Sequence, residues 1–346
     1  MTAVECPGAP TRTDRAGRPL PGTCGPCSEN LPNTTLEPEH PTPGGTIMAR
    51  TITVGLDGSA ESGAAAEWAA REAKLRDLPV RLIHVSMPVP EPMAQAPLLG
   101  AETHQHWTER VPREAAEGLR LRHPGVEVST EQRNGTPTEV LVEAARDAEL
   151  LVLGSRALSG LGGFLVGSVG QAVIARSEVP VVLVRAGEQA ADEHVMDPAG
   201  LPSAATAFRP VVLGLGSPDD TVIAFAFEEA RRRETALYVV QAWDTWPYAV
   251  YTVGPGFEHH ETFTRQRADA LADTLRPWRQ KYPDVEVVEM SRPGSAATHL
   301  IDASRDASLV VVGRRVRRNP FGTHIGAVTH AVLHHSTAPV AVVAHD

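Results

Sequence analysis

The chain has 346 residues, of which 42% are hydrophobic, and its formal net charge at pH 7 is −10. This length favours about two domains, and the acidic charge argues against a protein that binds nucleic acid. Apolar runs stay short of the roughly 18 residues that a membrane span needs. We therefore expect a cytoplasmic protein that has no membrane partner.

Residues 1–47 are rich in Pro, Gly, Thr and charged residues and show no periodic apolar pattern, which predicts a disordered tail. All three cysteines lie there, so the fold is not built on disulfides. Cys24 and Cys27 bracket a Gly-Pro pair as in thioredoxin-type redox motifs, but no strand or helix pattern surrounds them. Met48 directly precedes the first strand pattern, and we expect it to be the natural start of the protein.

Strand and helix patterns alternate through the next part of the chain. We predict strand 51–57, helix 61–76, strand 80–85, helix 103–122, strand 126–132, helix 136–148, strand 150–153, helix 169–176 and strand 181–184. Ser59 is a candidate cap for the first helix, and Pro137 suits the first turn of the third. The alternation predicts a doubly wound α/β fold with a parallel sheet.

Residues 154–168, with the sequence GSRALSGLGGFLVGS, lie between a purely apolar strand and a helix. A glycine-rich turn of this kind directs backbone N–H groups toward one point, and the helix N-terminus adds partial positive charge. This combination favours a phosphate ligand. An ordinary flexible loop is the alternative, because short glycine patterns are common.

The whole pattern returns after a polar linker over residues 187–207. Five pairs of residues share an offset of 159 positions: Gly55 and Gly214, Gly135 and Gly294, Gly154 and Gly313, Gly167 and Gly326, Pro180 and Pro339. The tripeptide at 146–148 recurs at 305–307 with the same offset. The chain is therefore predicted to be a tandem duplication, with a front repeat at 48–186 and a rear repeat at 208–346.

Four segments of the front repeat resemble motifs of the universal stress protein family. They are VGLDGS at 54–59, VLGSR at 152–156, LVGSV at 165–169 and VPVVLV at 179–184. The resemblance covers about residues 50–185 and 208–345, and the tandem form resembles the two-domain members found in actinobacteria. It implies two five-stranded parallel sheets with strand order 3-2-1-4-5, of the adenine-nucleotide alpha-hydrolase-like type. In the family's nucleotide-binding branch, ATP lies over strands 1 and 4, where strand order also reverses.

The motif of that branch is Gly, two residues, Gly, nine residues, then Gly-Ser or Gly-Thr. It maps onto Gly154, Ala157, Gly167 and Ser168, so an alanine stands where the second glycine is expected. Its methyl group is expected either to crowd the phosphates or to force a left-handed backbone, which costs about 1 kcal/mol or more. We expect weakened binding rather than none.

Three candidate ligand residues lie on the first two strands. Asp57 is expected to face the ribose or a magnesium ion, and Gly55 lets the nucleotide lie close to the backbone. Val85 is expected to contact the adenine. A plain turn or cap residue is the alternative for Asp57.

The other candidates lie around the glycine-rich segment. Gly154 and Ser155 are expected to line the ribose and phosphate, while Gly167, Ser168 and Val169 offer N–H groups and a hydroxyl to the phosphates. Ser168 could instead, or in addition, be the helix N-cap.

The rear repeat has lost several of these groups: Gly216 replaces Asp57, Val316 replaces Ala157 and Ala327 replaces Ser168. We expect it to hold no nucleotide. The nearby arginines could hold an anion or an acidic partner, or could form a solvated loop. They are Arg314, Arg315, Arg317 and Arg318.

The sequence gives little support for a metal site or a catalytic motif. Residues 258–261, Glu-His-His-Glu, are better explained as a solvated helix start, and His330 and His334 lack an evident third ligand. The chain contains no nucleophile elbow, Walker lysine motif or kinase signature. Metal ligands and catalytic residues are therefore not assigned.

The sequence thus predicts a stress protein that is not an enzyme. Its front repeat binds ATP or a related adenine nucleotide, with or without Mg²⁺, and its rear repeat is structural or regulatory. Alternatives are an interaction module that binds no nucleotide and a slow ATPase or phosphotransferase. The resemblance implies a homodimer through the last strand, although apolar strands 181–184 and 340–343 could instead pair within the chain.

Overall fold

The computed structural model describes residues 16–17, 50–86, 101–158, 163–243, 256–316 and 325–346, without the side chains of 101–108, 156–165 and 256–260. The predicted tail, its cysteines and Met48 therefore lie outside the described part, apart from residues 16–17. Residues 47–346 form one compact unit. In the described residues, no helix is both long and apolar enough to cross a bilayer.

Strands and helices alternate through the front repeat. Its elements are β1 Thr51–Leu56, α1 Ala60–Arg76, β2 Val80–Ser86, α3 Ala101–Arg122, β3 Val128–Asn134, α4 Pro137–Ala145, β4 Ala148–Leu158, β5 Gly163–Leu165, α5 Ser168–Arg176 and β6 Val181–Arg185. A 3-10 turn over Ala190–Glu193 lies in the linker.

The rear repeat has the same order of elements, except that its described residues include no counterpart of β5. They are β7 Val211–Gly214, α6 Asp220–Arg232, β8 Leu237–Trp243, α7 Gly256–Lys281, β9 Val287–Pro293, α8 Ala296–Ala303, β10 Leu309–Arg315, α9 Ala327–His335 and β11 Val340–His345, with a 3-10 turn over Ser304–Asp306.

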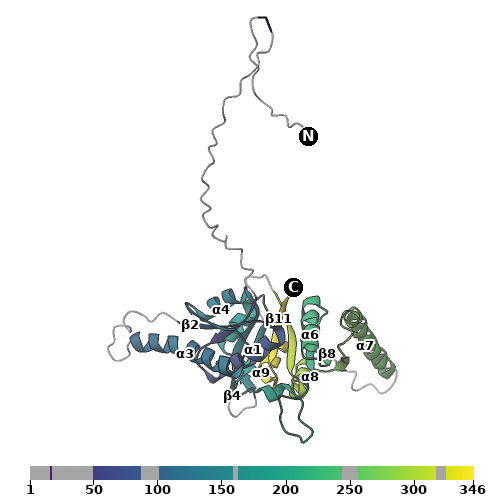
Figure 1. Cartoon of the computed structure of the whole chain (residues 1–346). Coiled ribbons are helices and arrows are strands. Elements are labelled where there is room, and N and C mark those ends of the chain that lie inside the picture. Colours follow the sequence, from purple (N-terminus) through teal and green to yellow (C-terminus); the bar gives the residue numbers. More distant parts are fainter. Residues whose placement is uncertain (1–15, 18–49, 87–100, 159–162, 244–255, 317–324) are drawn as a thin grey trace. The chain divides into compact units, whose positions relative to one another are not determined.

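The two repeats join into a single sheet in the order β3-β2-β1-β4-β6-β11-β10-β7-β8-β9, with β5 paired only to β4. Each half is parallel and has the predicted strand order 3-2-1-4-5, which confirms the α/β fold. The halves meet where β6 and β11 run antiparallel, so the two strands predicted as a pairing edge pair within the chain. Figure 1 shows helices packed along this sheet.

Each face of the sheet carries one apolar core that spans both repeats. The first core includes Trp68 of α1 and Phe227 of α6. The second, on the other face, includes Leu141 of α4 and Leu300 of α8. Strands buried on both faces explain the nearly continuous apolar runs in the sequence.

Several element ends differ from the prediction. The strand predicted at 150–153 extends to Leu158, because β5 returns and gives it an antiparallel partner. The first five residues of the predicted glycine-rich loop are thus strand. The third strand starts at Val128 rather than at 126, and α4 ends at Ala145 rather than near 148. Ser59 caps α1 as predicted, since its side chain accepts a hydrogen bond from the Ser62 N–H.

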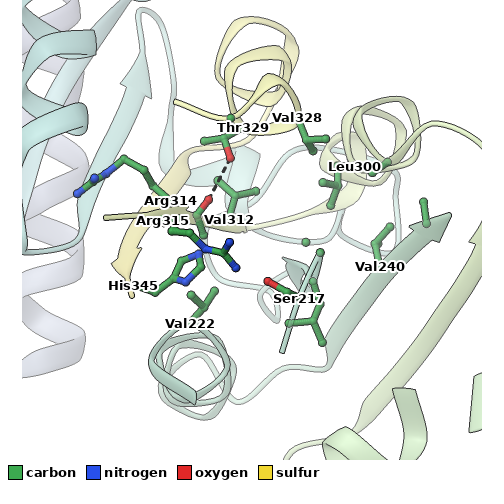
Figure 2. A pocket seen from close by; sticks show the side chains of 17 residues that line it. Ser217, Val222, Val240, Leu300, Val312, Arg314, Arg315, Val328, Thr329 and His345 are labelled. Carbon is green, nitrogen blue, oxygen red and sulfur yellow. Dashed lines mark hydrogen bonds between the residues drawn. The ribbon is translucent and has the colours of Figure 1, made fainter. Parts of the chain in front are cut away.

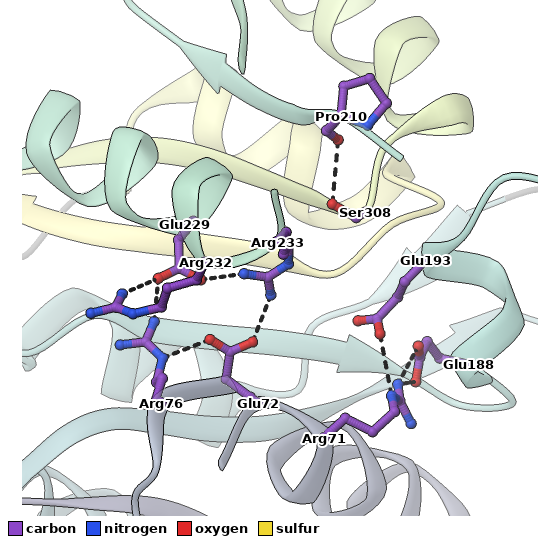
Figure 3. Close-up of polar contacts among 10 residues, drawn as sticks. All are labelled: Arg71, Glu72, Arg76, Glu188, Glu193, Pro210, Glu229, Arg232, Arg233 and Ser308. Atoms are coloured by element: carbon purple, nitrogen blue, oxygen red, sulfur yellow. Dashed lines mark hydrogen bonds and ion pairs between the residues drawn. The ribbon is translucent and has the colours of Figure 1, made fainter. Parts of the chain in front are cut away.

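A buried group of ion pairs joins α1 to α6, as Figure 3 shows. Arg233 contacts Glu72 at 2.6 Å and Glu229 at 2.5 Å. Arg76 contacts Glu72 at 2.6 Å and also Glu229. Burial disfavours the charge on Glu72, but Arg233 and Arg76 outweigh it and lower the pKa of that carboxyl to about 2. These four residues, the joint cluster, therefore form a charge-paired contact between the repeats.

The joint cluster is symmetric in sequence. Glu72 and Arg76 lie four residues apart on α1, and Glu229 of α6 lies four residues before Arg233, the C-cap residue of that helix. A left-handed residue follows each helix: Asp77 directly after α1, and Glu234 two positions after the end of α6. The offset between repeats is thus 157 here rather than 159, because α6, with 13 residues, is shorter than α1, with 17.

Candidate functional site

Asp57 directly follows β1 at the carboxyl edge of the sheet. Its Oδ1 accepts hydrogen bonds from the Ser59 N–H at 3.0 Å and from the Ser59 hydroxyl at 2.5 Å. Its side chain is exposed to solvent. Asp57 therefore serves the turn into α1, the role given as the alternative, while its carboxylate also faces outward at the strand end.

Gly154 lies where β4 passes beneath the first turn of α1. A Cβ atom on Gly154 would come within 2.4 Å of the Glu61 carbonyl carbon and 2.7 Å of the Ser62 nitrogen. A Cβ on Gly55 would come within 2.8 Å of a Leu153 methyl group. Close packing against backbone therefore requires Gly154, whatever ligand it meets, whereas a side chain at Gly55 would meet only the ends of leucine side chains.

The side chains of Ser155 and Val85 turn into the protein. Ser155 is buried, and its hydroxyl donates a 3.4 Å hydrogen bond to the Val184 carbonyl on β6. Val85 is half-buried and packs against the second core. Ala157 pairs with Phe164 as part of a strand, so its backbone is extended and the expected left-handed conformation does not occur.

Helix α5 presents its N-terminus at the same edge. Gly167 is the N-cap and Ser168 is the first helical residue, so the alternative role of Ser168 as the cap is wrong. Gly167, Ser168 and Val169 are exposed, and a Cβ on Gly167 would meet nothing within 4 Å. The first N–H groups of a helix have no partner within it, so this end can bind an anion.

His84 is a residue of this region that the sequence analysis did not single out. It is buried at the register position next to Leu56, and its Nδ1 lies 2.9 Å from the Leu56 carbonyl oxygen. This contact fixes the last residue of β1 just before Asp57. From the sequence alone, a single histidine inside a strand pattern does not reveal that it contacts the neighbouring strand.

The rear repeat holds a cavity of about 460 Å³ at its own carboxyl edge, shown in Figure 2. Its apolar wall includes Val240 of β8, Leu300 of α8 and Val312 of β10. Val316 and Ala327 are not among the lining residues. The substitutions that led us to expect a lost site therefore leave a cavity open.

The lining of this cavity corresponds to the residues predicted for the front repeat. Seven of the nine candidates have a counterpart there by offset and strand register: Gly214 for Gly55, Gly216 for Asp57, Ala242 for Val85, Gly313 for Gly154, Arg314 for Ser155, Gly326 for Gly167 and Val328 for Val169. In the rear repeat, these positions converge on one cavity.

Basic side chains lie on one side of the rear cavity. Arg315 and His345 are register partners on β10 and β11. Arg314 points away from the cavity in Figure 2, and its Nη2 donates to the Ser177 carbonyl of the front repeat. Burial lowers the pKa of Arg314 from its ordinary value. The predicted Arg317 and Arg318 lie outside the described residues.

No cluster of three metal-ligating side chains exists in the part of the chain that the structure describes. The His330 and His334 rings lie 4.4 Å apart, and burial together with His334 lowers the pKa of His330. The Glu-His-His-Glu run starts within α7, but the side chains of 258–260 are not described.

Comparison with known proteins gives consistent matches. The model of the Universal stress protein family matches residues 48–185 and 207–344. A universal stress protein of Mycolicibacterium smegmatis is 34% identical over 304 residues, which cover 84% of this chain and 96% of the relative. The crystal structure of a universal stress protein from Archaeoglobus fulgidus has a TM-score of 0.59 at 14% identity and covers 86% of this chain and 98% of its own. Another universal stress protein, solved in complex with cAMP, is 27% identical over 40% of this chain and 98% of its own, with a TM-score of 0.30.

Proposed function

The chain belongs to the universal stress protein family, and from that premise we propose that its front repeat binds one adenine nucleotide, with ATP as the expected ligand. The binding groups are the exposed carboxylate of Asp57 and the open N-terminus of α5 at Gly167 and Ser168. The former suits ribose hydroxyls and the latter suits phosphates.

The observation that carries this proposal is the cavity in the rear repeat. Its lining contains counterparts of seven front candidates, so the same fold can bring these positions around one hollow. The front repeat has a group that a nucleotide needs at one of those positions, since it carries Asp57 rather than Gly216. Next to another of them, Gly167, it carries Ser168 rather than Ala327.

Residues of the front repeat divide the work. Asp57 would hold the ribose while its bond to Ser59 keeps it oriented, and the first turn of α5 would bind phosphate oxygens. Ser155 would act through its backbone, because its hydroxyl already donates to Val184. Mg²⁺ would enter on the ATP phosphates, whose oxygens are its usual ligands, rather than through a preformed cluster of side chains. The front repeat would sense the nucleotide by binding it and would not hydrolyse it.

Isothermal titration calorimetry with ATP tests the proposal. We expect one ATP per chain, and about tenfold weaker binding for Asp57→Asn, because a charge-assisted hydrogen bond is lost while the turn keeps an acceptor. Asp147→Asn is the matched control, since this exposed residue precedes β4 at the opposite edge of the sheet. Binding that Asp57→Asn leaves unchanged would disprove the assigned site.

Two other results would favour the alternatives. A folded chain that binds no ATP would be an interaction module. Phosphate release that exceeds an Asp57→Asn control would indicate a slow ATPase. The homodimer implied by the resemblance stays a prediction, to be measured by analytical ultracentrifugation of the full chain.

A further inference from the structure

We propose that the cavity of the rear repeat binds a small anion with an apolar body, a ligand of a different class from the nucleotide proposed for the front repeat. The cavity of about 460 Å³ has room for a ring compound of modest size. Of the residues that the structure describes, seventeen line it, and none of these seventeen is Asp or Glu. The front repeat has Asp57 at the corresponding edge.

The inner wall of the cavity is apolar. Val240, Leu300 and Val312 line it, and each is at least 97% buried in the fold. Gly214 allows this wall to close, because a Cβ there would come within 2.8 Å of a Leu300 methyl group. Apolar ligand surface placed against such a wall is removed from water, which is favourable.

The rim of the cavity is positively charged. Arg315 is exposed on β10, and within the described residues no carboxylate pairs with it. His345 lies beside it on β11 and is oriented by Asp219, whose Oδ2 is 3.3 Å from its Nδ1. Asp219 also caps α6 and does not line the cavity. A carboxylate or phosphate group on the ligand would meet Arg315 directly.

Helix α9 adds to the same electrostatic preference. It begins at Ala327, its N-cap Gly326 lines the cavity, and a Cβ on Gly326 would meet nothing within 4 Å. The partial positive charge of this helix end favours an anionic group. Arg315 and the helix end thus favour the same sign of ligand charge.

A ribonucleotide suits this cavity less well. Gly216 offers no carboxylate to ribose hydroxyls, and Ala327 offers no hydroxyl to a phosphate. Arg314, the counterpart of Ser155, is held by the Ser177 carbonyl and takes no part. A compact anion whose body needs no hydrogen bonds can use the groups that this cavity does offer, which are the apolar wall, Arg315 and the N-terminus of α9.

Fluorine NMR on the full chain can test this with 4-(trifluoromethyl)benzoate as the probe. We expect saturable binding of one probe per chain, with a dissociation constant in the millimolar range or below. The neutral 4-(trifluoromethyl)benzyl alcohol has the same body and should bind about tenfold more weakly, and so should inorganic phosphate, which lacks that body. Absence of benzoate binding, or equal binding of the alcohol, would overturn the proposal.

Two variants locate the site. Arg315→Gln should weaken benzoate binding by about tenfold, because it removes the charge while keeping a hydrogen-bond donor. Gly216→Asp should weaken it by a similar factor through repulsion, whereas Gly216→Asn, of equal size, should change it by less than about threefold. A side chain at Gly216 meets no atom within 4 Å, so both variants should fold. Benzoate binding that Arg315→Gln leaves intact would refute the site.

The same samples separate this inference from the proposed function. Asp57→Asn should leave benzoate binding unchanged, and saturating ATP should not displace the probe. Displacement of the probe by ATP would show a nucleotide site in the rear repeat and would contradict the inference. A chain that binds benzoate but not ATP would contradict only the function proposed for the front repeat and would leave this inference intact.

Discussion

Gly154 was predicted as a ligand residue, but at the scale of single residues its packing role is the sharper one. We predict that Gly154→Ala lowers the free energy of unfolding by about 3 kcal/mol, because the new methyl group would clash with the backbone of Glu61. Gly167→Ala should cost less than about 1 kcal/mol, because nothing lies within 4 Å of its Cβ position.

Urea unfolding at neutral pH measures both variants. Equal destabilisation would mean that α1 does not pack on β4 as described. The comparison also has a practical use, because loss of ligand binding in Gly154→Ala could arise from α1 alone. Gly167→Ala is the better test of phosphate binding at the N-terminus of α5, because it should not disturb the packing of the fold.

Glu188 gives a prediction for pH. It shares Arg71 with Glu193, and its Oε1 lies 2.6 Å from Arg71 Nη2. Burial, assisted by the charge of Glu193, raises the pKa of Glu188 from 4.5 to about 7 despite that contact. The folded chain then binds more protons than the unfolded chain between these values, so stability should fall as pH rises from about 4.5 to about 7.

Glu188→Gln should flatten this part of the stability curve, because it removes the titrating group. The measurement is the free energy of unfolding by urea at several pH values from 4.5 to 8. Glu127→Gln, at an exposed position, should keep the slope of the unaltered chain. A slope that Glu188→Gln leaves unchanged would show that other groups cause it, such as Glu193 and Glu229, whose pKa values burial also raises.

At the scale of elements, the joint cluster decides how α1 and α6 hold together. We predict that Arg233→Met costs about 3–5 kcal/mol, because it leaves Glu72 and Glu229 buried with one fewer cation. Glu72→Gln in the same chain should recover part of that loss, since the two residues contact at 2.6 Å.

A double-mutant cycle by chemical unfolding gives the coupling energy. Arg276→Met is the control, because Arg276 pairs with Asp273 on the exposed side of α7 and should change stability by less than about 0.5 kcal/mol. Additive effects of Arg233→Met and Glu72→Gln would contradict the described contact.

Elements were largely predictable because their signals are local. The cap at Ser59 and the start of α4 at Pro137 follow from residue type and position. The extension of β4 to Leu158 was not predictable, because it depends on pairing with β5. The burial of Ser155 was missed for a similar reason, since its partner, Val184, lies on another strand.

At the scale of the whole molecule, the duplication was visible in the spacing of glycines, whereas its physical consequences were not. Glu72 and Arg233 are far apart in the chain, and a buried charge pair leaves no periodic pattern. The open rear cavity was also missed, because comparison of single positions cannot show whether Val316 would fill it. It does not line the cavity, and the space is set by Leu300 and Val312 instead.

The register between β6 and β11 has a further consequence for how the two halves can change. Val182 pairs with Ala341, which is its own counterpart at the repeat offset, so a local twofold axis passes between them. Two identical chains meeting on such an axis would have to place the same side chain on both sides. Here a valine faces an alanine, an unequal match that two identical chains could not form, and each repeat is therefore free to acquire its own chemistry.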